Sequence, residues 1–259
     1  MQFDRFDVPR YLSVLPLFEG AAPDVVTRIA AASQLRKLGR AQTVFQPGQA
    51  ADGYNVTVYG QVKLFALSAG GQEKVIELAG PGHGFGEELL FHGARHDFGA
   101  QALTDTMLLT VARDALLREV RRDADLALRM LRGLSRRVRG LMHDVQAHAL
   151  HSGQQRVVNY LLSDLTTLDR RDVTVTLPAS KCTIASRLSI TPEYFSRVLH
   201  ELESAGLIRI DGRNIGIPDP GRLADTIDDP RVPGRDPVAC SGPAKGAPTR
   251  PATLQAVAA

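Results

Sequence analysis

The spacing of apolar residues changes along the chain and divides it into a β-rich part and a helical part. From Leu35 to Val111, apolar positions alternate over short segments that are separated by glycine or proline. These segments are Thr43–Phe45, Tyr54–Val58, Gln61–Phe65 and Lys74–Leu78. Many short strands joined by glycine turns are typical of an antiparallel roll or sandwich. The pattern therefore predicts a compact β-roll in the first half of the chain.

Helical spacing flanks the predicted roll on both sides. Before it, residues 10–33 carry apolar side chains at helical intervals, which indicates a short helical lid. After it, one helix is predicted over 112–122 and a longer one over 123–149. We therefore expect an α+β protein in which residues 1–112 form a domain with lid and antiparallel β-roll, and residues 113–150 form helices that lead out of it.

The segment 180–217 has the layout of a winged helix-turn-helix. Its first short helix has one apolar face, made by Ile184, Ala185 and Leu188. After a turn, Thr191 can cap a second helix whose first position is Pro192. The buried stripe of this second helix is predicted to be Phe195, Val198, Leu199 and Leu202. Two helices around a tight turn predict a unit that reads DNA.

A β-hairpin follows the second helix and completes the unit. The helix is expected to stop at Gly206, and the alternating residues on either side of Asp211-Gly212 predict the two strands of a wing. A further amphipathic helix over 152–168 precedes the helix-turn-helix. We therefore assign residues 151–223 to a DNA-binding domain.

The polar face of the second helix has the chemistry of base recognition. Its candidates for DNA contact are Glu193, Ser196, Arg197 and His200, together with Thr191 at the cap. An arginine can donate two hydrogen bonds to guanine, a glutamate can accept one from cytosine, and a serine can reach either edge. An i,i+4 ion pair on a solvated helix would explain Glu193 and Arg197 taken alone. The adjoining turn and wing favour DNA contact.

The long helix over 123–149 carries a heptad seam. Its members alternate in steps of four and three, and they are Ala127, Leu131, Leu134, Val138, Leu141, Val145 and His148. Such a seam suits packing on the chain's own β-roll or pairing with a second copy, and periodicity alone does not decide between them. Helix-turn-helix proteins commonly read inverted half-sites with two-fold symmetry, which favours a homodimer.

Charge and cysteine content add few constraints. The net charge of +3 is only mildly basic, and two cysteines, Cys182 and Cys240, are too few for a disulfide framework. The N-terminal residues lack the apolar core of a signal peptide, and no apolar run reaches the length of a membrane span. We therefore expect a cytoplasmic protein with no membrane partner. Prolines become frequent after Pro218, which predicts a disordered tail over 224–259.

The motifs of common enzyme classes are missing from the sequence. It contains no nucleophile motif, no phosphate-binding loop and no paired metal-ligand signature. A cupin-type metal enzyme would share a β-roll, but it normally needs two histidines separated by one residue, and this spacing does not occur. We therefore expect a protein that is not an enzyme.

Along most of its predicted folded length, from Tyr11 to Leu223, the chain resembles the Crp/Fnr family of bacterial transcription regulators. The segments that carry the resemblance are Gly60–Leu64, Phe85–Phe91 and Glu193–Arg197. Two more runs, Gly71–Glu77 and Leu188–Glu193, are similar to the dissimilatory nitrate respiration regulators, a branch that responds to nitric oxide and controls denitrification. The resemblance implies a cyclic-nucleotide-binding-like β-roll, a dimerisation helix and RNA polymerase as a partner, which the protein would recruit as an activator or block as a repressor.

The resemblance also assigns roles to the second helix of the DNA-binding domain. In Fnr-like members, a Glu followed by Ser and Arg at this spacing reads inverted TTGAT-type half-sites, and the matching residues are Glu193, Ser196 and Arg197. Cyclic-AMP-type members carry a further arginine just before the Glu, where this chain has Pro192. The resemblance therefore implies an Fnr-type box.

For the effector, the resemblance implies a pocket in the β-roll. Cyclic-AMP-binding members hold the phosphate with a Gly-Glu pair and a downstream Arg-Ser pair. Gly86 and Glu87 match the first pair, whereas Asp97 and Phe98 stand at the second. Arg95 lies close in sequence and could serve as the cation if the loop shifted, so Gly86, Glu87 and Arg95 are the effector-pocket candidates. Cyclic AMP is nevertheless disfavoured, because a carboxylate replaces a guanidinium.

Two other sensing chemistries are known in the family. An iron–sulfur cluster needs several thiolates, and no cysteine precedes Cys182, so a cluster is not expected. The nitrate respiration branch implies haem bound by imidazole between the β-roll and the long helix. The histidines are His83, His92, His96, His143, His148, His151 and His200, and sequence assigns none as the ligand. We expect His83, His92 and His96 to lie on exposed loops.

The expected mechanism is a two-state switch in which an effector at the β-roll changes how the long helix packs against its dimer mate. The alternative from another class is a cyclic-nucleotide-binding module that regulates a protein partner without binding an operator.

Overall fold

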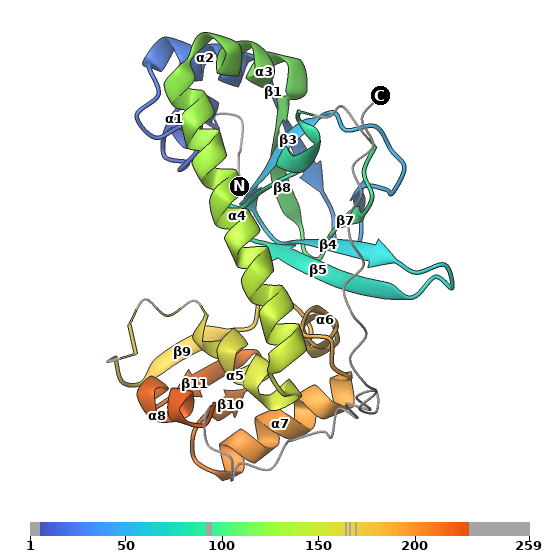
Figure 1. Ribbon diagram of the computed structural model, residues 1–259, viewed down its shortest axis with the longest axis vertical. Helices are drawn as coiled ribbons and strands as arrows, with labels where there is room; N and C mark the ends of the chain where they lie inside the picture. Colours follow the sequence, from blue (N-terminus) through green and yellow to red (C-terminus); the bar gives the residue numbers. More distant parts are fainter. Residues whose placement is uncertain (1–5, 92–94, 164, 166, 169, 228–259) are drawn as a thin grey trace, which may run out of the picture.

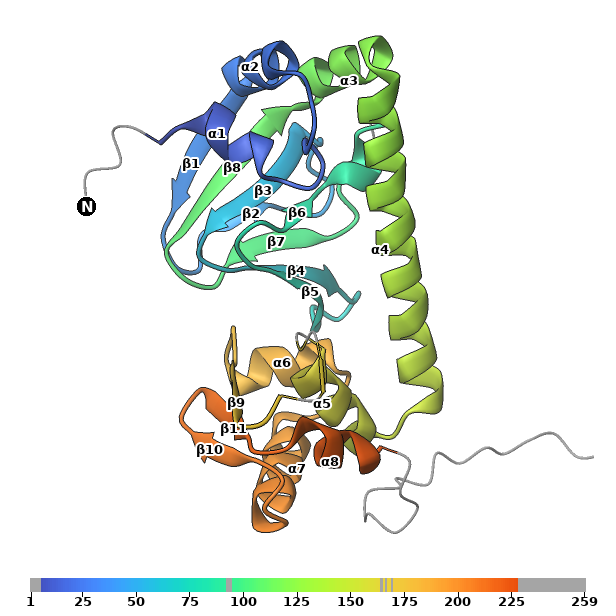
Figure 2. The ribbon, with the colours of Figure 1, turned by 90° about the vertical axis from the view of Figure 1, so that its left-hand side faces the viewer.

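In the computed structural model, residues 6–91, 95–163, 165, 167–168 and 170–227 are described. The first part is a β-roll of two four-stranded antiparallel sheets (Figures 1 and 2). One sheet has the order β1 (Ser33–Leu38), β8 (Thr106–Ala112), β3 (Gly53–Tyr59) and β6 (Gly84–Phe85). The other has the order β2 (Thr43–Phe45), β7 (Gly99–Ala102), β4 (Val62–Leu67) and β5 (Glu73–Ala79). The predicted roll is confirmed.

Three helices cover one end of the roll; the first two correspond to the predicted lid and the third to the helix predicted over 112–122. They are α1 (Val8–Ser13), α2 (Pro23–Ala31) and α3 (Arg113–Arg122) (Figure 2). Their apolar faces pack on the sheet of β3 and β8 in one buried cluster that includes Leu12, Ile29, Leu109 and Leu116. Packing of amphipathic helices on one sheet face removes apolar area from water, which is the main stabilising contribution of this domain.

The long helix α4 (Ala124–Leu150) connects the two ends of the molecule. Asp123 caps it by accepting hydrogen bonds from the backbone N–H groups of Asp125 and Leu126. The helix leaves the lid, passes along one side of the β-roll and reaches the C-terminal domain (Figures 1 and 2). Within it only Leu126 and Met130, both near the lid, are fully buried. Most of its length is therefore available for contact with another surface.

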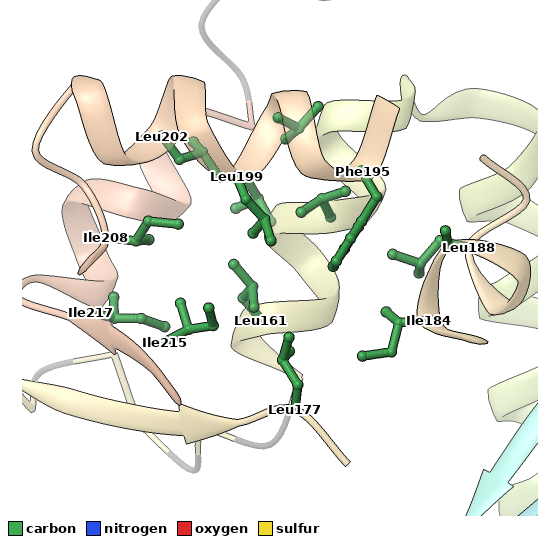
Figure 3. Packing of buried hydrophobic residues seen from close by; sticks show 14 of the residues in the cluster. Leu161, Leu177, Ile184, Leu188, Phe195, Leu199, Leu202, Ile208, Ile215 and Ile217 are labelled. Carbon is green, nitrogen blue, oxygen red and sulfur yellow. The ribbon is translucent and has the colours of Figure 1, made fainter. Parts of the chain in front are cut away.

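The C-terminal domain is a winged helix-turn-helix. Its helices are α5 (Gly153–Leu162), α6 (Lys181–Arg187), α7 (Pro192–Ser204) and α8 (Pro220–Asp225). Its three-stranded sheet has the order β10 (Arg209–Asp211), β11 (Asn214–Ile217) and β9 (Val173–Thr176). Figure 3 shows Phe195, Leu199 and Leu161 meeting Ile184 and Ile215 in the core between these elements. The predicted buried stripe of the second helix is confirmed.

The structure differs from the prediction at the end of α5, at one additional strand and at the C-terminal end of the domain. Helix α5 ends at Leu162 instead of continuing to 168, and the Ser163 hydroxyl donates to the Tyr160 carbonyl there, which competes with the helical ladder. The domain also contains β9, which the sequence analysis did not predict. Residues 224 and 225, assigned to the tail, belong to α8, because Asp219 caps this helix and Pro220 starts it. Residues 228–259 of the predicted tail lie outside the described residues, as does Cys240.

Among the described residues, no helix is long and apolar enough to cross a membrane.

Candidate DNA-binding face and sensor pocket

Helix α7 lies at the end of the molecule farthest from the lid (Figure 1). Thr191 caps it by accepting a hydrogen bond from the backbone N–H of Tyr194 at 3.2 Å, and Pro192 occupies the first turn. With the apolar stripe buried, the side chains of Glu193, Arg197 and His200 are exposed and Ser196 is half-buried. The structure therefore brings the predicted DNA-binding candidates together on one open face.

Arg197 is held over an aromatic ring rather than paired with Glu193. Its guanidinium carbon lies 4.8 Å from the centroid of the Tyr194 ring, which is a cation–π contact. Its Nε lies 3.8 Å from a carboxylate oxygen of Glu201, one turn further along. Sequence reasoning missed the role of Tyr194, although the i,i+3 spacing to Arg197 was available as a signal.

A glycine makes room for this aromatic ring. A Cβ atom on Gly153, the first residue of α5, would lie 2.6 Å from Cε1 of Tyr194. Because carbon atoms cannot approach that closely, any larger residue at 153 would displace the ring. The start of α5 thus controls where Tyr194, and with it Arg197, can lie.

The tight turn between α6 and α7 also depends on local backbone geometry. Ser189 adopts a left-handed conformation with φ of 55°, and the Ile190 N–H donates to the Ala185 carbonyl at 3.1 Å. Ser180 caps α6 by accepting from the Thr183 N–H at 3.2 Å. These contacts hold α6 and α7 in an arrangement in which α7 can enter a major groove.

An apolar stripe on α4 remains exposed. Four seam residues have large exposed fractions: Leu131 57%, Val138 56%, Leu141 48% and Val145 68%. Ala127 and His148, at the two ends of the predicted seam, and Leu134 within it are half-buried. The sequence analysis missed Leu128 and Met142, which extend the stripe with exposed fractions of 49% and 60%. An apolar stripe of this length is typical of a helix that pairs with another.

An arginine from α4 reaches the corner of the β-roll that holds Gly86 and Glu87. Gly86 turns the chain with φ of 91°, and Glu87 begins the 3-10 helix η1 (Glu87–Leu89). Arg137 reaches into this corner and forms ion pairs with Glu87 at 3.2 Å and with Glu77 of β5 at 2.5 Å. Sequence reasoning identified Glu87 but missed Arg137 and Glu77, since the pairing joins segments far apart in the chain.

This corner contains the carboxyl groups of Glu87 and Glu88. Burial raises the pKa of Glu87 and of Glu88, with Arg137 acting in the opposite direction on both. The two carboxylate oxygens of Glu88 are buried without a well-aligned hydrogen bond to any described residue. When these carboxyl groups are ionised they repel an anion, and burial strengthens the repulsion because the local dielectric constant is low. The corner is therefore poorly suited to a phosphate.

The expected rescue of the pocket by Arg95 does not occur. Arg95 is exposed and its Nη1 donates to the Gly48 carbonyl at 2.8 Å. The prediction that His96 lies on an exposed loop is wrong: its side chain is buried and stacks on the Phe45 ring with centroids 3.6 Å apart. His83 is exposed as predicted, and His92 lies outside the described residues. Of the three effector-pocket candidates, only Gly86 and Glu87 lie in the corner.

The β-roll and the helix-turn-helix touch through β5 and α6. The Lys74 Nζ donates to the Ser186 carbonyl, to the Arg187 carbonyl at 3.2 Å and to the Ser189 hydroxyl at 2.6 Å. The Val75 N–H donates to the Ser186 hydroxyl at 2.9 Å. Arg187 also pairs with Asp144 of α4 at 2.6 Å. Strand β5, helix α4 and helix α6 are thus joined at one place.

Comparisons with known proteins agree with this architecture. Residues 35–123 match the cyclic nucleotide-binding domain, and residues 155–226 match the Crp-like helix-turn-helix domain. The cyclic AMP receptor protein of Thermus thermophilus is 30% identical over 195 residues, which cover 75% of this chain and 88% of that protein. The chain belongs to the Crp/Fnr family.

Two solved structures are also similar to this chain. The structure of FixK2 from Bradyrhizobium japonicum covers 76% of this chain and 98% of its own, with a TM-score of 0.67 and 24% identity, and it supports the fold alone. DNR from Pseudomonas aeruginosa is 31% identical, covers 86% of this chain and 100% of its own, and has a TM-score of 0.48. The relatives are transcription regulators, and Crp-family regulators bind DNA.

Proposed function

We propose that this Crp/Fnr regulator works as a homodimer that reads an inverted TTGAT-type box. The observation that carries the proposal is the open face of α7, where Glu193, Ser196 and Arg197 lie together with the chemistry of base recognition. Thr191 and His200 border this face and are suited to contacts with the DNA backbone.

The exposed stripe of α4 supports the dimer. Burial of Leu131, Val138, Leu141 and Val145 against the same residues of a second copy would remove the largest apolar surface of the helix from water. Two copies related by a two-fold axis along α4 would present two recognition helices to an inverted site. The bound dimer then acts on RNA polymerase in the cytoplasm, either by recruiting it as an activator or by blocking it.

For the signal, we propose nitric oxide sensed through haem, as in the nitrate respiration branch. The acidic corner at Glu87 and Glu88 argues against a cyclic nucleotide there, because the phosphate would meet buried carboxylates with Arg137 already paired. Imidazole groups are available elsewhere: four histidines line one cavity next to α4. Haem would supply the nitric oxide-binding iron, and the chain would supply the imidazole and the surrounding walls.

The experiment that tests the DNA-binding part uses the full chain and three duplexes. Affinity is measured by fluorescence anisotropy at fixed salt for a TTGAT palindrome, for the same palindrome with the guanines replaced, and for a scrambled duplex. The proposal expects tight binding to the first, weaker binding to the second and the weakest binding to the third. Equal affinity for all three would contradict sequence-specific recognition of this box.

The effector is tested on the same samples. Addition of haem and then nitric oxide without oxygen should increase affinity for the palindrome, whereas cyclic AMP should neither bind in calorimetry nor change the affinity. Binding of cyclic AMP without any binding to DNA would instead indicate a cyclic-nucleotide-binding module that acts on a protein partner.

A further inference from the structure

The DNA-binding domain is joined to the rest of the chain by a short connector, His151–Ser152, between α4 and α5. Outside this domain, the described apolar residues that pack against its buried core are Leu78 and Leu103. A connector of this length can still rotate about its backbone dihedrals, and two half-buried leucines bury little surface. Other contacts must therefore set the direction in which α7 points.

The first such contact is made by Lys74 of β5. Its ammonium group donates to the carbonyls of Ser186 and Arg187, at the C-terminal end of α6, and to the hydroxyl of Ser189 in the turn before α7 at 2.6 Å. The last carbonyls of a helix have no partner within the helix and carry partial negative charge, so they suit a cation. Burial, with Arg187 and Arg156 nearby, lowers the pKa of Lys74 to about 8. The amine is still mostly protonated at pH 7, so the contact is a charged one.

The second contact comes from α4. The carboxylate of Asp144 accepts from the guanidinium of Arg187 at 2.6 Å, and both side chains are partly buried, with 40% and 22% exposed. Strand β5 and helix α4 are thus both attached to α6. Two attachments on different elements oppose a rotation of the domain that either one alone would permit.

The turn that Lys74 contacts is also tied to other parts of its own domain. Arg156 of α5 donates to the Ser189 carbonyl at 3.4 Å and to the carbonyl of His151, in the connector, at 3.2 Å. Ser189 stands two residues before Thr191, which caps α7. Lys74 therefore acts at the point where α7 begins.

Helix α7 stays uncovered while both contacts are formed. The side chains of Glu193, Arg197 and His200 are exposed, and α7 lies at the end of the molecule farthest from the lid (Figure 1). A dimer that reads an inverted site must hold its two recognition helices at the separation that the two half-sites set. A domain that rotated freely would have to be ordered on binding, which costs affinity. A domain that is held in advance avoids this cost and binds poorly to half-sites at another separation.

We propose that Lys74 is a positioning residue: together with the pair of Arg187 and Asp144, it fixes the separation of the two recognition helices in the dimer. Affinity then depends on the number of base pairs between the half-sites. The inference rests on the proposed homodimer and its inverted box, and it adds a determinant of spacing that itself touches no DNA.

The test measures the affinity of the full chain, at fixed salt, for three duplexes. They are the TTGAT palindrome, the same palindrome with two base pairs inserted between its half-sites, and a duplex with a single half-site. The variants are Lys74→Met, which keeps an unbranched side chain but loses the ammonium group, and Asp144→Asn, which removes the charge on the α4 side. Lys63→Met is the matched control, because Lys63 of the neighbouring strand β4 pairs with Glu73 at 2.6 Å inside the β-roll.

The unaltered chain and Lys63→Met should prefer the palindrome to the lengthened duplex. Lys74→Met should lose about tenfold in affinity for the palindrome, the scale expected when a hydrogen bond to a charged group is removed. Its affinity for the single half-site should stay the same, so its preference between the two palindromes should shrink. Asp144→Asn should change in the same direction. Sedimentation should show that both variants are still dimers.

The outcomes separate this inference from the function on which it rests. If Lys74→Met and Asp144→Asn keep the palindrome affinity and the preference for its spacing, the inference is wrong and the proposed box stands. An equal loss on all three duplexes would also overturn it, because that result indicates a damaged fold instead of a misplaced helix. An unaltered chain that binds both palindromes equally well would do the same. Failure of the unaltered chain to distinguish the TTGAT palindrome from scrambled DNA would overturn the proposed function and the inference together.

Discussion

The arginine on the face of α7 and the arginine in the corner at Glu87 differ in their exposure and in their partners. On α7, the guanidinium of Arg197 rests on an aromatic ring with its side chain exposed, ready for another molecule. In the corner, Arg137 is already paired with two carboxylates of its own chain. The first arrangement is suited to recognition and the second to holding α4 against the β-roll. Substitutions on α7 and the α4 stripe should therefore alter binding, whereas substitutions in the corner should alter stability.

The largest effect is expected on the exposed stripe of α4. Leu141→Glu places a charge at the centre of the proposed dimer contact, where it would be buried without a partner. We expect monomers in sedimentation and a loss of palindrome affinity on the order of 100-fold or more. Val14→Glu, at an exposed apolar residue of the lid, is the control and should leave both unchanged. A dimeric Leu141→Glu with normal affinity would show that α4 is not the dimer contact.

A smaller but more specific effect is expected at Arg197. Arg197→Ala should weaken binding to the TTGAT palindrome by about 1–3 kcal/mol and should reduce the discrimination at the guanine. The melting temperature should stay the same, because the side chain is exposed. Arg40→Ala removes the same charge from the exposed surface of the sensor and serves as the control. If Arg197→Ala loses the same free energy on scrambled DNA, the residue contacts only phosphate.

In the acidic corner the expected change is in stability. The folded-state pKa of Glu88 lies above its ordinary value of 4.5 because of burial, so ionisation costs free energy in the folded protein. This cost is absent at acid pH and grows as pH rises above the ordinary value. Glu88→Gln should therefore raise the free energy of unfolding at neutral pH, and the gain should shrink as the solution is acidified. Urea titrations at several pH values measure this, and an equal gain at all pH values would contradict the assigned cause.

The smallest effect is expected at Tyr194, which touches no DNA in this scheme but supports Arg197. Tyr194→Leu removes the aromatic face, and a cation–π contact at an exposed site contributes about 0.5–1 kcal/mol, so affinity for the palindrome should fall by roughly two- to fivefold. Tyr194→Phe keeps the face and should bind normally. A Phe variant that is as weak as the Leu variant would assign the effect to the hydroxyl instead.

The two regions also differ in how far the sequence predicts them. The face of α7 follows from local rules: Thr191 and Pro192 set the start, and the 3.6-residue period buries Phe195 and exposes Arg197. The seam of α4 follows from the same period. By contrast, the pairing of Arg137 with Glu77 joins residues that are far apart in sequence, and no local pattern indicates it. The burial of His96 was not predicted for the same reason, because it depends on stacking with the ring of Phe45 in β2.

The contact between β5 and α6 has a consequence for how independent the two domains can be. β5 is the outer strand of its sheet, and an outer strand carries backbone groups that can pair with any other strand. Here the N–H of Val75 donates a hydrogen bond to the Ser186 hydroxyl, and the Nζ of Lys74 donates to the carbonyl of Arg187, the last residue of α6. The DNA-binding domain thus acts as a cover that keeps the sheet from adding a foreign strand. A sensor domain cut off before α5 would carry an uncovered edge and would be prone to self-association.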